Sequence, residues 1–501
     1  MTDEDRLPVV VAAGQALERS ELVTALELAG RAVEAALEGT GGLRSRVGVV
    51  SVVNILSRVG PSPAGILARR AGLGPVRTEV TTVGGNSPQW LVNRAAAAIA
   101  GGSGGTFLIA GAEAQRSSRV RREQRALGDD SVSGPGTGTE EDAGLPPDEV
   151  VGDDRPGMGP AEVNAGLVAP VHVYPLFESA LAHQAGRDPA AQREFLGTVL
   201  APFTEVAAGN PWAWFPEVRT PAELSEVTAE NRLVAEPYPK RMCAVMGVDQ
   251  AACLVVTSLG TARALGLAQG AVFCWSGADA ADVWFPSARP DPGRSPGIAA
   301  AAGAALGAAG IGPDELSSLD LYSCFPCALE LAAEAIGISL DDHRGLTVTG
   351  GLPYFGGPGN NYTLHAIATM VERLGREGGT GLVTGLGWYA TKHSVGIYGG
   401  SPPVGGWAPG ETGPDQARID AGAVVVAGEV GGRAGATVLA STVVAGPDGS
   451  PAAAPVIARL DDGRQVAAAA EETELAGLAG LSLVGHRVEV SGGPPRYRVA
   501  G

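Results

Sequence analysis

The chain has 501 residues, 45% of them hydrophobic, and a formal net charge of −18 at pH 7. This length predicts two to four domains, and the lack of any apolar run of about 18 residues excludes a membrane-spanning helix. The acidic balance disfavours nucleic acid and anionic membranes as partners.

Cysteine usage and the first residues indicate a reducing compartment. The five cysteines are an odd number, and three of them lie in apolar stretches. We therefore expect free thiols and no disulfide framework. The acidic start of the chain has the features of neither a signal nor a transit peptide. Together these features predict a cytoplasmic protein.

The first 112 residues alternate between strands and helices. We expect strands at 9–13, 47–53, 77–83 and 106–110, and helices at 21–37, 63–71 and 88–100. Continuous apolar strands that alternate with helices predict a parallel sheet covered on both faces. This segment and residues 236–290 are expected to form one α/β half. Within 236–290 we expect a helix at 248–265 and a strand at 271–275.

Residues 113–235 interrupt the pattern and are predicted to be an inserted loop domain. Five arginines between Arg116 and Arg125 precede an acidic stretch, rich in Gly and Pro, that ends near Asp154. We expect this stretch to be mobile. Helices are predicted near 176–186 and 190–208.

A second α/β half is predicted over 291–400, followed by a small C-terminal domain over 410–501. In the second half we expect helices at 298–310, 327–336 and 361–374 and strands at 318–322, 381–386 and 394–398. In the last domain we expect short strands at 418–427, 436–445, 455–460, 464–470, 485–491 and 496–499, with a short helix at 472–479. That order is typical of an OB-like β-barrel. Since it offers few cations and only Tyr497 for stacking, packing or partner contact is expected, and single-strand binding is not.

The turn at residues 84–89 lies between a β-branched strand and an alanine-rich helix. A tight glycine turn at a helix start presents backbone N–H groups and one side chain, a usual setting for a nucleophile or an oxyanion. No nucleophile is present here, however. Ser87 has no base next to it in sequence and is expected to cap the helix.

This order of elements resembles the N-terminal half of the thiolases, in which a Cys-x-Ser motif opens the helix. The resemblance covers roughly residues 1–400 and is closest to the sterol-carrier-protein branch. With its appended barrel, the chain is similar to the type-1 thiolase-like proteins, which carry an additional C-terminal domain. The resemblance implies an α/β fold, a five-layer αβαβα core of two related halves.

The resemblance also implies four catalytic positions, and this chain has another residue type at each. Gly85, or Gly84 if the turn shifts by one, stands at the acyl-accepting cysteine. Gly357 stands at the histidine of the Gly-His-Pro loop, Gly385 at the second cysteine, and Tyr322 at the residue that holds the oxyanion-site water. Loss of nucleophile and base costs on the order of 10⁴ to 10⁶ in rate, so we expect no cysteine acyl-enzyme.

The resemblance implies that the binding frame persists and takes CoA or an acyl-CoA as a noncovalent ligand. The candidate binding residues are Gly84, Gly85, Ser87, Gly356, Gly357, Asn360, Asn361, Lys240 and Lys392. The two lysines are the only ones in the chain. An ammonium is a point charge whose pKa moves readily, which makes both lysines site candidates. The alternative is that their positions are due to chance. The arginines at 116–125 are either a phosphate contact or a solvated or subunit surface.

A second hypothesis is a tyrosine-dependent carbon–carbon lyase acting on an acyl-CoA. Tyr322, Tyr354, Tyr362 and His393 are the candidate catalytic residues, since a tyrosine close to a cation can act as an acid or base. The analogy is with the steroid side-chain aldolases, thiolase-like proteins that use tyrosines and an OB-fold partner. The alternatives are half-buried rings for the tyrosines, a core position for His365, and helix capping for Asn360 and Asn361.

A third hypothesis is a non-catalytic scaffold whose C-terminal domain binds a protein partner. Cys324 and Cys327 form a Cys-x-x-Cys pair at a helix start, which in isolation suggests a redox pair or half of a metal site. No second pair of ligand spacing exists, so we expect no metal. We expect a monomer or a homodimer.

Overall fold

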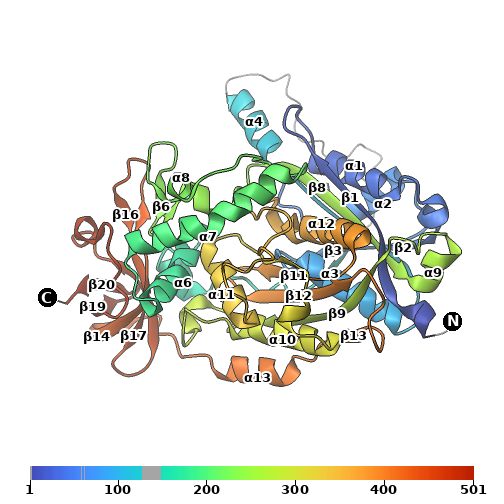
Figure 1. Ribbon diagram of the computed structural model, residues 1–501. Coiled ribbons are helices and arrows are strands. Elements are labelled where there is room, and N and C mark those ends of the chain that lie inside the picture. The colour runs from blue at the N-terminus through green and yellow to red at the C-terminus, as the bar shows by residue number, and fades with distance from the viewer. Residues whose placement is uncertain (1–2, 58, 61, 127–147, 501) are drawn as a thin grey trace.

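The computed structural model describes residues 3–57, 59–60, 62–126 and 148–500. Most of the acidic stretch predicted to be mobile, residues 127–147, lies outside the described residues. Figure 1 shows an α/β body that contains the N-terminus and a small all-β unit at the C-terminus, at opposite ends of the molecule.

An 11-stranded mixed sheet forms the body, with the strand order β10-β11-β12-β9-β1-β8-β4-β2-β3-β5 and with β13 paired to β9. Its strands are β1 (Pro8–Leu17), β2 (Val47–Val52), β3 (Arg77–Thr81), β4 (Thr106–Ala114), β5 (Glu149–Val151), β8 (Asp249–Ser258), β9 (Val272–Ala281), β10 (Ser318–Asp320), β11 (Thr380–Gly387), β12 (Lys392–Gly399) and β13 (Ala408–Pro409). β1 and β9 share only two residue pairs, so this contact joins two halves of the sheet.

Two sequence expectations about this sheet are wrong. The segment 248–265 was expected to be a helix, but most of it is β8, and only Leu259–Ala264 form a helix, α9. Every residue of β8 is buried, and its run of Val and Thr suits a central strand. The sheet is also not parallel throughout. β8 returns after the inserted segment and lies antiparallel between β1 and β4, whereas β2 pairs in parallel with β3 and β4.

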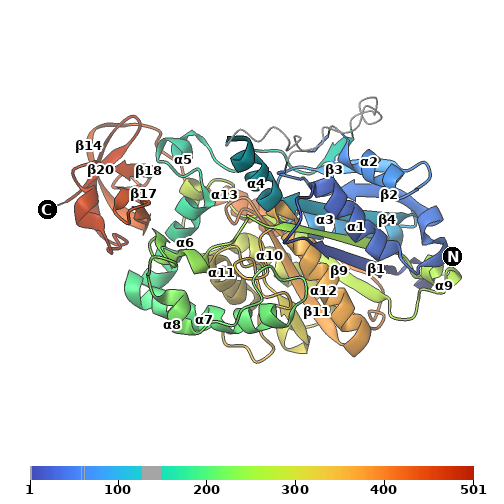
Figure 2. The same ribbon diagram turned by 90° about the horizontal axis from the view of Figure 1, so that it is seen from above.

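Five layers of structure follow from where the helices pack. α3 (Ser87–Ala100) and α12 (Tyr362–Glu377) lie in the middle and contact strands of both halves of the sheet. α1 (Ala25–Leu37) and α2 (Pro63–Arg70) cover the outer face of the first half of the sheet. α10 (Pro296–Ala309) covers the outer face of the second half, and α11 (Pro326–Ile336) packs against α10. Figure 2 shows α3 and α12 among the strands. The predicted αβαβα core is therefore confirmed.

The inserted segment is mainly helical. It contains α4 (Gln115–Ala126), α5 (Pro160–Asn164), α6 (Pro170–Gln184), α7 (Pro189–Gly209), α8 (Pro221–Ser225) and the short strands β6 (Leu233–Ala235) and β7 (Tyr238–Pro239). The domain boundaries expected from the sequence stay a prediction. Within the described residues, no helix is both long and apolar enough to cross a membrane.

The C-terminal unit is a closed barrel with the strand order β14-β17-β18-β20-β19. Its strands are β14 (Val430–Ser441), β17 (Pro455–Leu460), β18 (Gln465–Ala470), β19 (Arg487–Gly492) and β20 (Arg496–Val499). The expected barrel is confirmed, but the strand expected at 418–427 is wrong. Residues Gly413–Ala421 form helix α13, and the valine run after it pairs through an isolated bridge, Val426 to Gln465, with Val425 69% exposed. The helix expected at 472–479 is a short 3-10 turn, Leu475–Leu478.

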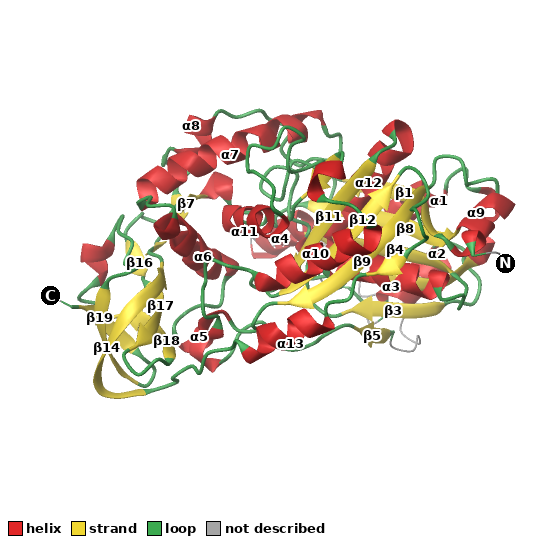
Figure 3. Cartoon of the chain, turned by 60° about the horizontal axis from the view of Figure 1, so that its bottom comes forward, coloured by secondary structure: helices red, strands yellow, loops and turns green. Residues whose placement is uncertain are grey.

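A backbone ladder attaches the barrel to the inserted segment. β15 (Val444–Ala445) and β16 (Pro451–Ala453) leave the barrel and join β6 and β7 in a 4-stranded sheet. The Ser441 N–H also donates to Ser179 Oγ of α6 at 2.9 Å. Figure 3 shows the barrel beside α6 and α5, away from the core sheet. The OB-like label and the expected partner contact stay predictions.

Candidate functional site

The turn before α3 has no room for a side chain at position 85. A Cβ on Gly85 would lie 2.5 Å from the backbone oxygen of Leu386 and closer still to the phenol oxygen of Tyr322, whereas Cβ atoms essentially never come within 3.0 Å of such neighbours. Tyr322 is 6% exposed. The phenol therefore occupies the space that a cysteine would need, and the glycine and the tyrosine form one matched pair.

The other two glycines at positions expected to be catalytic, Gly385 and Gly357, differ from each other. A Cβ on Gly385 would lie 2.9 Å from the Cα of Asn86, so this position is closed by backbone. A Cβ on Gly357 would meet its nearest neighbour, the Val245 oxygen, at 3.4 Å, an ordinary contact. Gly356 has φ 112°, a conformation that favours glycine. Position 357 alone of these three sites could accept a side chain.

Asn360, after the Gly-rich loop, stabilises the turn from the side of α12. Asn360 accepts a hydrogen bond from the Gly84 N–H at 3.0 Å and donates to the Asn54 oxygen. Thr363 donates to the Gly85 oxygen at 2.7 Å. Asn361 precedes α12, but its side chain makes no capping hydrogen bond. Gly84 and Asn360, both expected to bind ligand, are therefore already hydrogen-bonded to each other.

The three candidate tyrosines are buried, and two of them are in contact. Tyr362 lies edge-to-face against Tyr322, with ring centroids 5.4 Å apart, and its hydroxyl donates to Asp320 at 3.0 Å. The Tyr354 hydroxyl has no hydrogen-bond partner among the described residues. Burial raises the pKa of each of these phenols above the ordinary value of 10.0. A general base works best with a pKa near the working pH, so these environments disfavour the lyase hypothesis.

His365 and Ser87 have local structural roles. The His365 ring is fully buried, pairs with Gln15 Oε1 at 2.7 Å, and has its pKa lowered by burial to about 3. Ser87 was expected to be the N-cap, but Asn86 holds that position, and the Ser87 hydroxyl donates to the Thr82 oxygen.

Lys392 and His393, at the start of β12, contact different partners. Lys392 donates to the Val83 oxygen at 2.6 Å, just before the turn. His393 Nε2 lies 3.0 Å from a carboxylate oxygen of Asp282, and its Nδ1 has no partner among the described residues. Ser295 donates to the same Asp282 oxygen. Burial alone would raise the pKa of Asp282, but the hydrogen bond and charge of His393 hold it below its ordinary value.

Burial lowers the pKa of Lys392 from 10.5 to about 8, and this shift predicts a pH effect on stability. Below pH 8 the amine is charged in both states, and the folded state bears the full cost of burying that charge. Between about pH 8 and 10.5 the folded protein releases the proton first, so the unfolded state binds more protons and stability rises with pH. We expect wild type to gain stability relative to Lys392→Met over this window in urea unfolding. A difference in unfolding free energy between wild type and Lys392→Met that does not change with pH would contradict the lowered pKa of Lys392.

A cavity of 530 Å³ lies beside the turn and brings part of the candidate set together. Its wall includes Asn86, Ser87, Trp90, Arg155, Asp279, Asp282, Trp284, Lys392 and His393. The three tyrosines and Gly357 do not line it. Lys240 is exposed in the short turn Lys240–Met242, outside this wall. The predicted site is therefore divided into a closed centre around Gly85 and Tyr322 and an open polar cavity on the side of Lys392.

Sequence reasoning missed two features of this cavity. Asp282 is the partner of His393, although the two residues are far apart in the chain. The Arg155 guanidinium stacks over Trp284, 3.6 Å from the ring centroid, and closes one side. Neither residue belongs to a motif; the one sequence signal was the rare lysine next to a histidine at a strand start.

The cysteines and the arginine-rich helix do not line the cavity beside Lys392. All five cysteines are free and buried, and burial raises the pKa of Cys324 to about 12, which opposes a nucleophilic role. The described residues contain no cluster of three or more His, Cys, Asp or Glu side chains that could hold a metal. In α4, Arg116 donates to the Glu21 oxygen and Arg121 to the Val23 oxygen, so these two arginines fasten α4 to the segment before α1.

The five-layer core, with a glycine turn at the start of its central helix, defines a thiolase-fold protein. The chain is 31% identical to a monomeric SCP2-thiolase like protein of type 1 from Mycobacterium smegmatis, over 99% of each chain, with a TM-score of 0.83. It therefore belongs to the SCP2-thiolase-like proteins of type 1.

Two further solved structures share the fold at lower identity. One is an Ltp2-ChsH2(DUF35) aldolase, 20% identical over 79% of this chain and 98% of that one, with a TM-score of 0.58. The other is an acetyl-CoA acetyltransferase from Syntrophomonas wolfei, 17% identical over 79% of this chain and 99% of that one, with a TM-score of 0.55. No protein-family model and no curated protein matched the chain.

Proposed function

We propose that this protein binds an acyl-CoA thioester without forming an acyl-enzyme and does not perform thiolysis or condensation. The observation that carries the proposal is the pairing of Gly85 with Tyr322. Since the phenol and the Leu386 oxygen fill the space beside Gly85, there is neither a nucleophile nor room for the acyl group that it would carry.

The Lys392 cavity is the proposed place for the thioester end of the ligand. Its volume is in the range of small-molecule sites, about 300–1,000 Å³. Asn86 and Ser87 bring the N-terminus of α3, which favours partial negative charge, to the cavity wall. Lys392 supplies an ammonium, and buried Asn86 Oδ1 has no hydrogen-bond partner among the described residues. A thioester carbonyl beside Lys392 would accept a hydrogen bond from that ammonium.

Titration calorimetry of the full chain with acetyl-CoA tests the binding. We expect heat of binding for wild type and for the control variant Lys240→Met. Lys240 is the only other lysine in the chain, and it is exposed. Lys392→Met should bind at least about tenfold more weakly, because a hydrogen bond to a charged group contributes about 1.5–3 kcal/mol. Thermal unfolding of each variant verifies that it is folded. No heat at millimolar acetyl-CoA, or equal binding by the two variants, would refute the assignment.

A turnover assay tests the absence of covalent chemistry separately. With acetoacetyl-CoA and free CoA, we expect no thiolysis above background and no labelled acetyl group retained on the denatured protein. Turnover at ordinary enzymatic rates, about 1 s⁻¹ or more, would contradict the proposal even if acetyl-CoA binds.

A further inference from the structure

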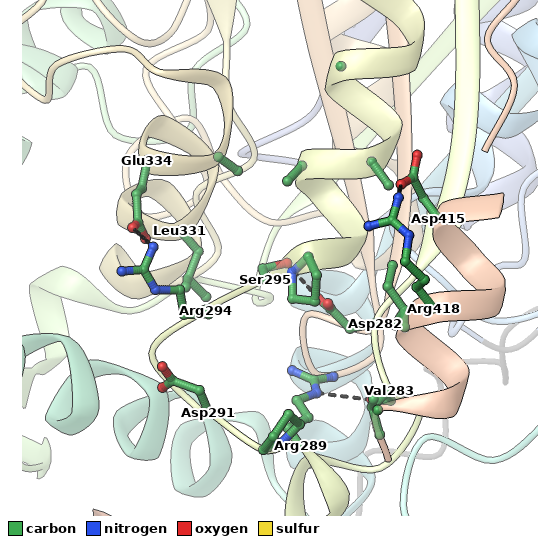
Figure 4. Close-up of a pocket in the computed structure, with 18 of the residues that line it drawn as sticks. Asp282, Val283, Arg289, Asp291, Arg294, Ser295, Leu331, Glu334, Asp415 and Arg418 are labelled. Atoms are coloured by element: carbon green, nitrogen blue, oxygen red, sulfur yellow. Dashed lines mark hydrogen bonds and ion pairs between the residues drawn. The ribbon is translucent and has the colours of Figure 1, made fainter. Parts of the chain in front are cut away.

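A second and larger cavity, of 930 Å³, lies between α10, α11 and α13 (Figure 4). It is separate from the three tyrosines and from the turn at Gly85. Asp282 lines both this cavity and the Lys392 cavity, so the two cavities are neighbours and share this residue. A cavity of this volume is large enough for a small organic ligand.

The floor of the cavity is apolar because the facing residues of α10 are small. Ala299, Ala300, Gly303 and Ala304 form this side of the helix. Opposite them lie Leu331 and Ala335 of α11 and Ile419 of α13. A Cβ on Gly303 would have no neighbour within 4 Å, so the space above this residue is empty. Such a slot between helices suits the apolar body of a ligand.

Arg289 places a buried cation at the end of this slot. It is 4% exposed and donates from Nε to the Val283 oxygen and from Nη2 to the Tyr389 oxygen and the Thr391 hydroxyl, all neutral acceptors. Among the described residues, no hydrogen bond uses its Nη1 and no carboxylate forms an ion pair with it. Figure 4 shows its guanidinium pointing into the hollow. Buried charges are usually paired. Burial lowers the pKa of Arg289, and Asp282 and Glu162 partly offset this effect through their charge, but neither carboxylate is within ion-pair distance, so Nη1 can donate to an anion in the cavity.

The remaining charges of the wall restrict the anion that fits. Arg294 pairs with Glu334 and Arg418 with Asp415, so neither guanidinium is free of a carboxylate. Asp282, Asp291 and Glu411 add negative charge to the wall. These carboxylates repel a polyanion such as the phosphate groups of CoA, whereas a single charge close to Arg289 is accommodated.

We propose that this cavity binds a small monocarboxylic acid, with its carboxylate on Arg289 Nη1 and its apolar body along α10. The proposal is independent of acyl-CoA binding at the Lys392 cavity. It assigns to the chain a second ligand site, for a free acid, next to the site proposed for the thioester.

Calorimetric titration with octanoate tests the proposal, with octan-1-ol as the neutral ligand of equal chain length. Wild type should bind octanoate at least tenfold more tightly than octan-1-ol. Gly303→Leu fills the empty space and should weaken octanoate binding at least tenfold. Gly307→Leu is the matched control, since Gly307 lies one turn further along α10, outside the cavity wall, and its Cβ would also meet nothing within 4 Å.

Each outcome of this experiment is decisive. Equal octanoate binding by Gly303→Leu and Gly307→Leu would exclude the α10 slot. Equal binding of octanoate and octan-1-ol by wild type would exclude Arg289 as the carboxylate contact, and this result does not depend on whether an Arg289 variant folds. Unchanged acetyl-CoA binding by Gly303→Leu would verify that the two cavities act separately.

Discussion

Replacing Gly85 by alanine is expected to lower the free energy of unfolding by about 3 kcal/mol, at the upper end of the usual cost of overpacking. The new methyl group would meet the Leu386 backbone oxygen and the Tyr322 phenol, and the backbone oxygen cannot rotate away. Gly357→Ala is the matched control, because its methyl group would meet no atom closer than 3.4 Å. We expect this control to be within about 1 kcal/mol of wild type. Urea unfolding of both variants gives the comparison.

A double-mutant cycle separates the two contacts at Gly85. Tyr322→Phe removes the phenol oxygen but leaves the Leu386 oxygen in place. In this background we expect Gly85→Ala to cost about 1 kcal/mol less than in wild type, since residues in contact couple by about 0.5–3 kcal/mol. Equal stability of Gly85→Ala and Gly357→Ala would refute the matched pair. For the same reason Gly85→Cys should be destabilised and should not restore thiolysis.

Replacing Asp320 by alanine is expected to cost about 4 kcal/mol or more, the largest effect of any single substitution considered. Its carboxylate is fully buried. One oxygen accepts from the Thr347 hydroxyl and from the Val348 and Thr349 N–H groups, and the other accepts from Tyr362. Alanine leaves these donors buried without a partner, and each unsatisfied group costs about 1–3 kcal/mol.

Two further variants give this prediction its controls. Asp314→Ala, at an exposed position shortly before β10, should change the free energy of unfolding by less than about 0.5 kcal/mol. Tyr362→Phe removes a single donor and should cost about 1 kcal/mol. If Asp320→Ala were as stable as Asp314→Ala, the network would not be structural, and a functional role for Tyr362 would regain support.

An element of the fold could be predicted where its sequence pattern lies within a short stretch of the chain. The turn at 84–87, the helix after it and the second half over 291–400 each have a pattern within a short window, and these elements form where expected. The position of β8 has no such signal. Its apolar run of Ala, Leu and Val suits a buried helix as well as a central strand, and only the space between β1 and β4 selects the strand.

The candidate site was predictable only in part, for the same reason. The residue types at the four positions that the resemblance implies to be catalytic can be read directly from the chain, and none of them is a cysteine or a histidine. The sequence did not indicate that Lys392 and His393 lie apart from Tyr354 and Tyr362. That separation depends on the direction of side chains on β12 and on the depth of the Gly-rich loop, which are set by packing.

The sequence by itself determined the thiolase-like core and the appended barrel, because each follows from residue types and local spacing. Only the tertiary structure decided that Tyr322 fills the space beside Gly85, that Asp282 pairs with His393, and that Arg289 forms no ion pair with a carboxylate of the described residues. Each of these relations joins segments far apart in the chain. Such contacts depend on the packing of α3, β12 and α10 against one another, which no short window of sequence specifies.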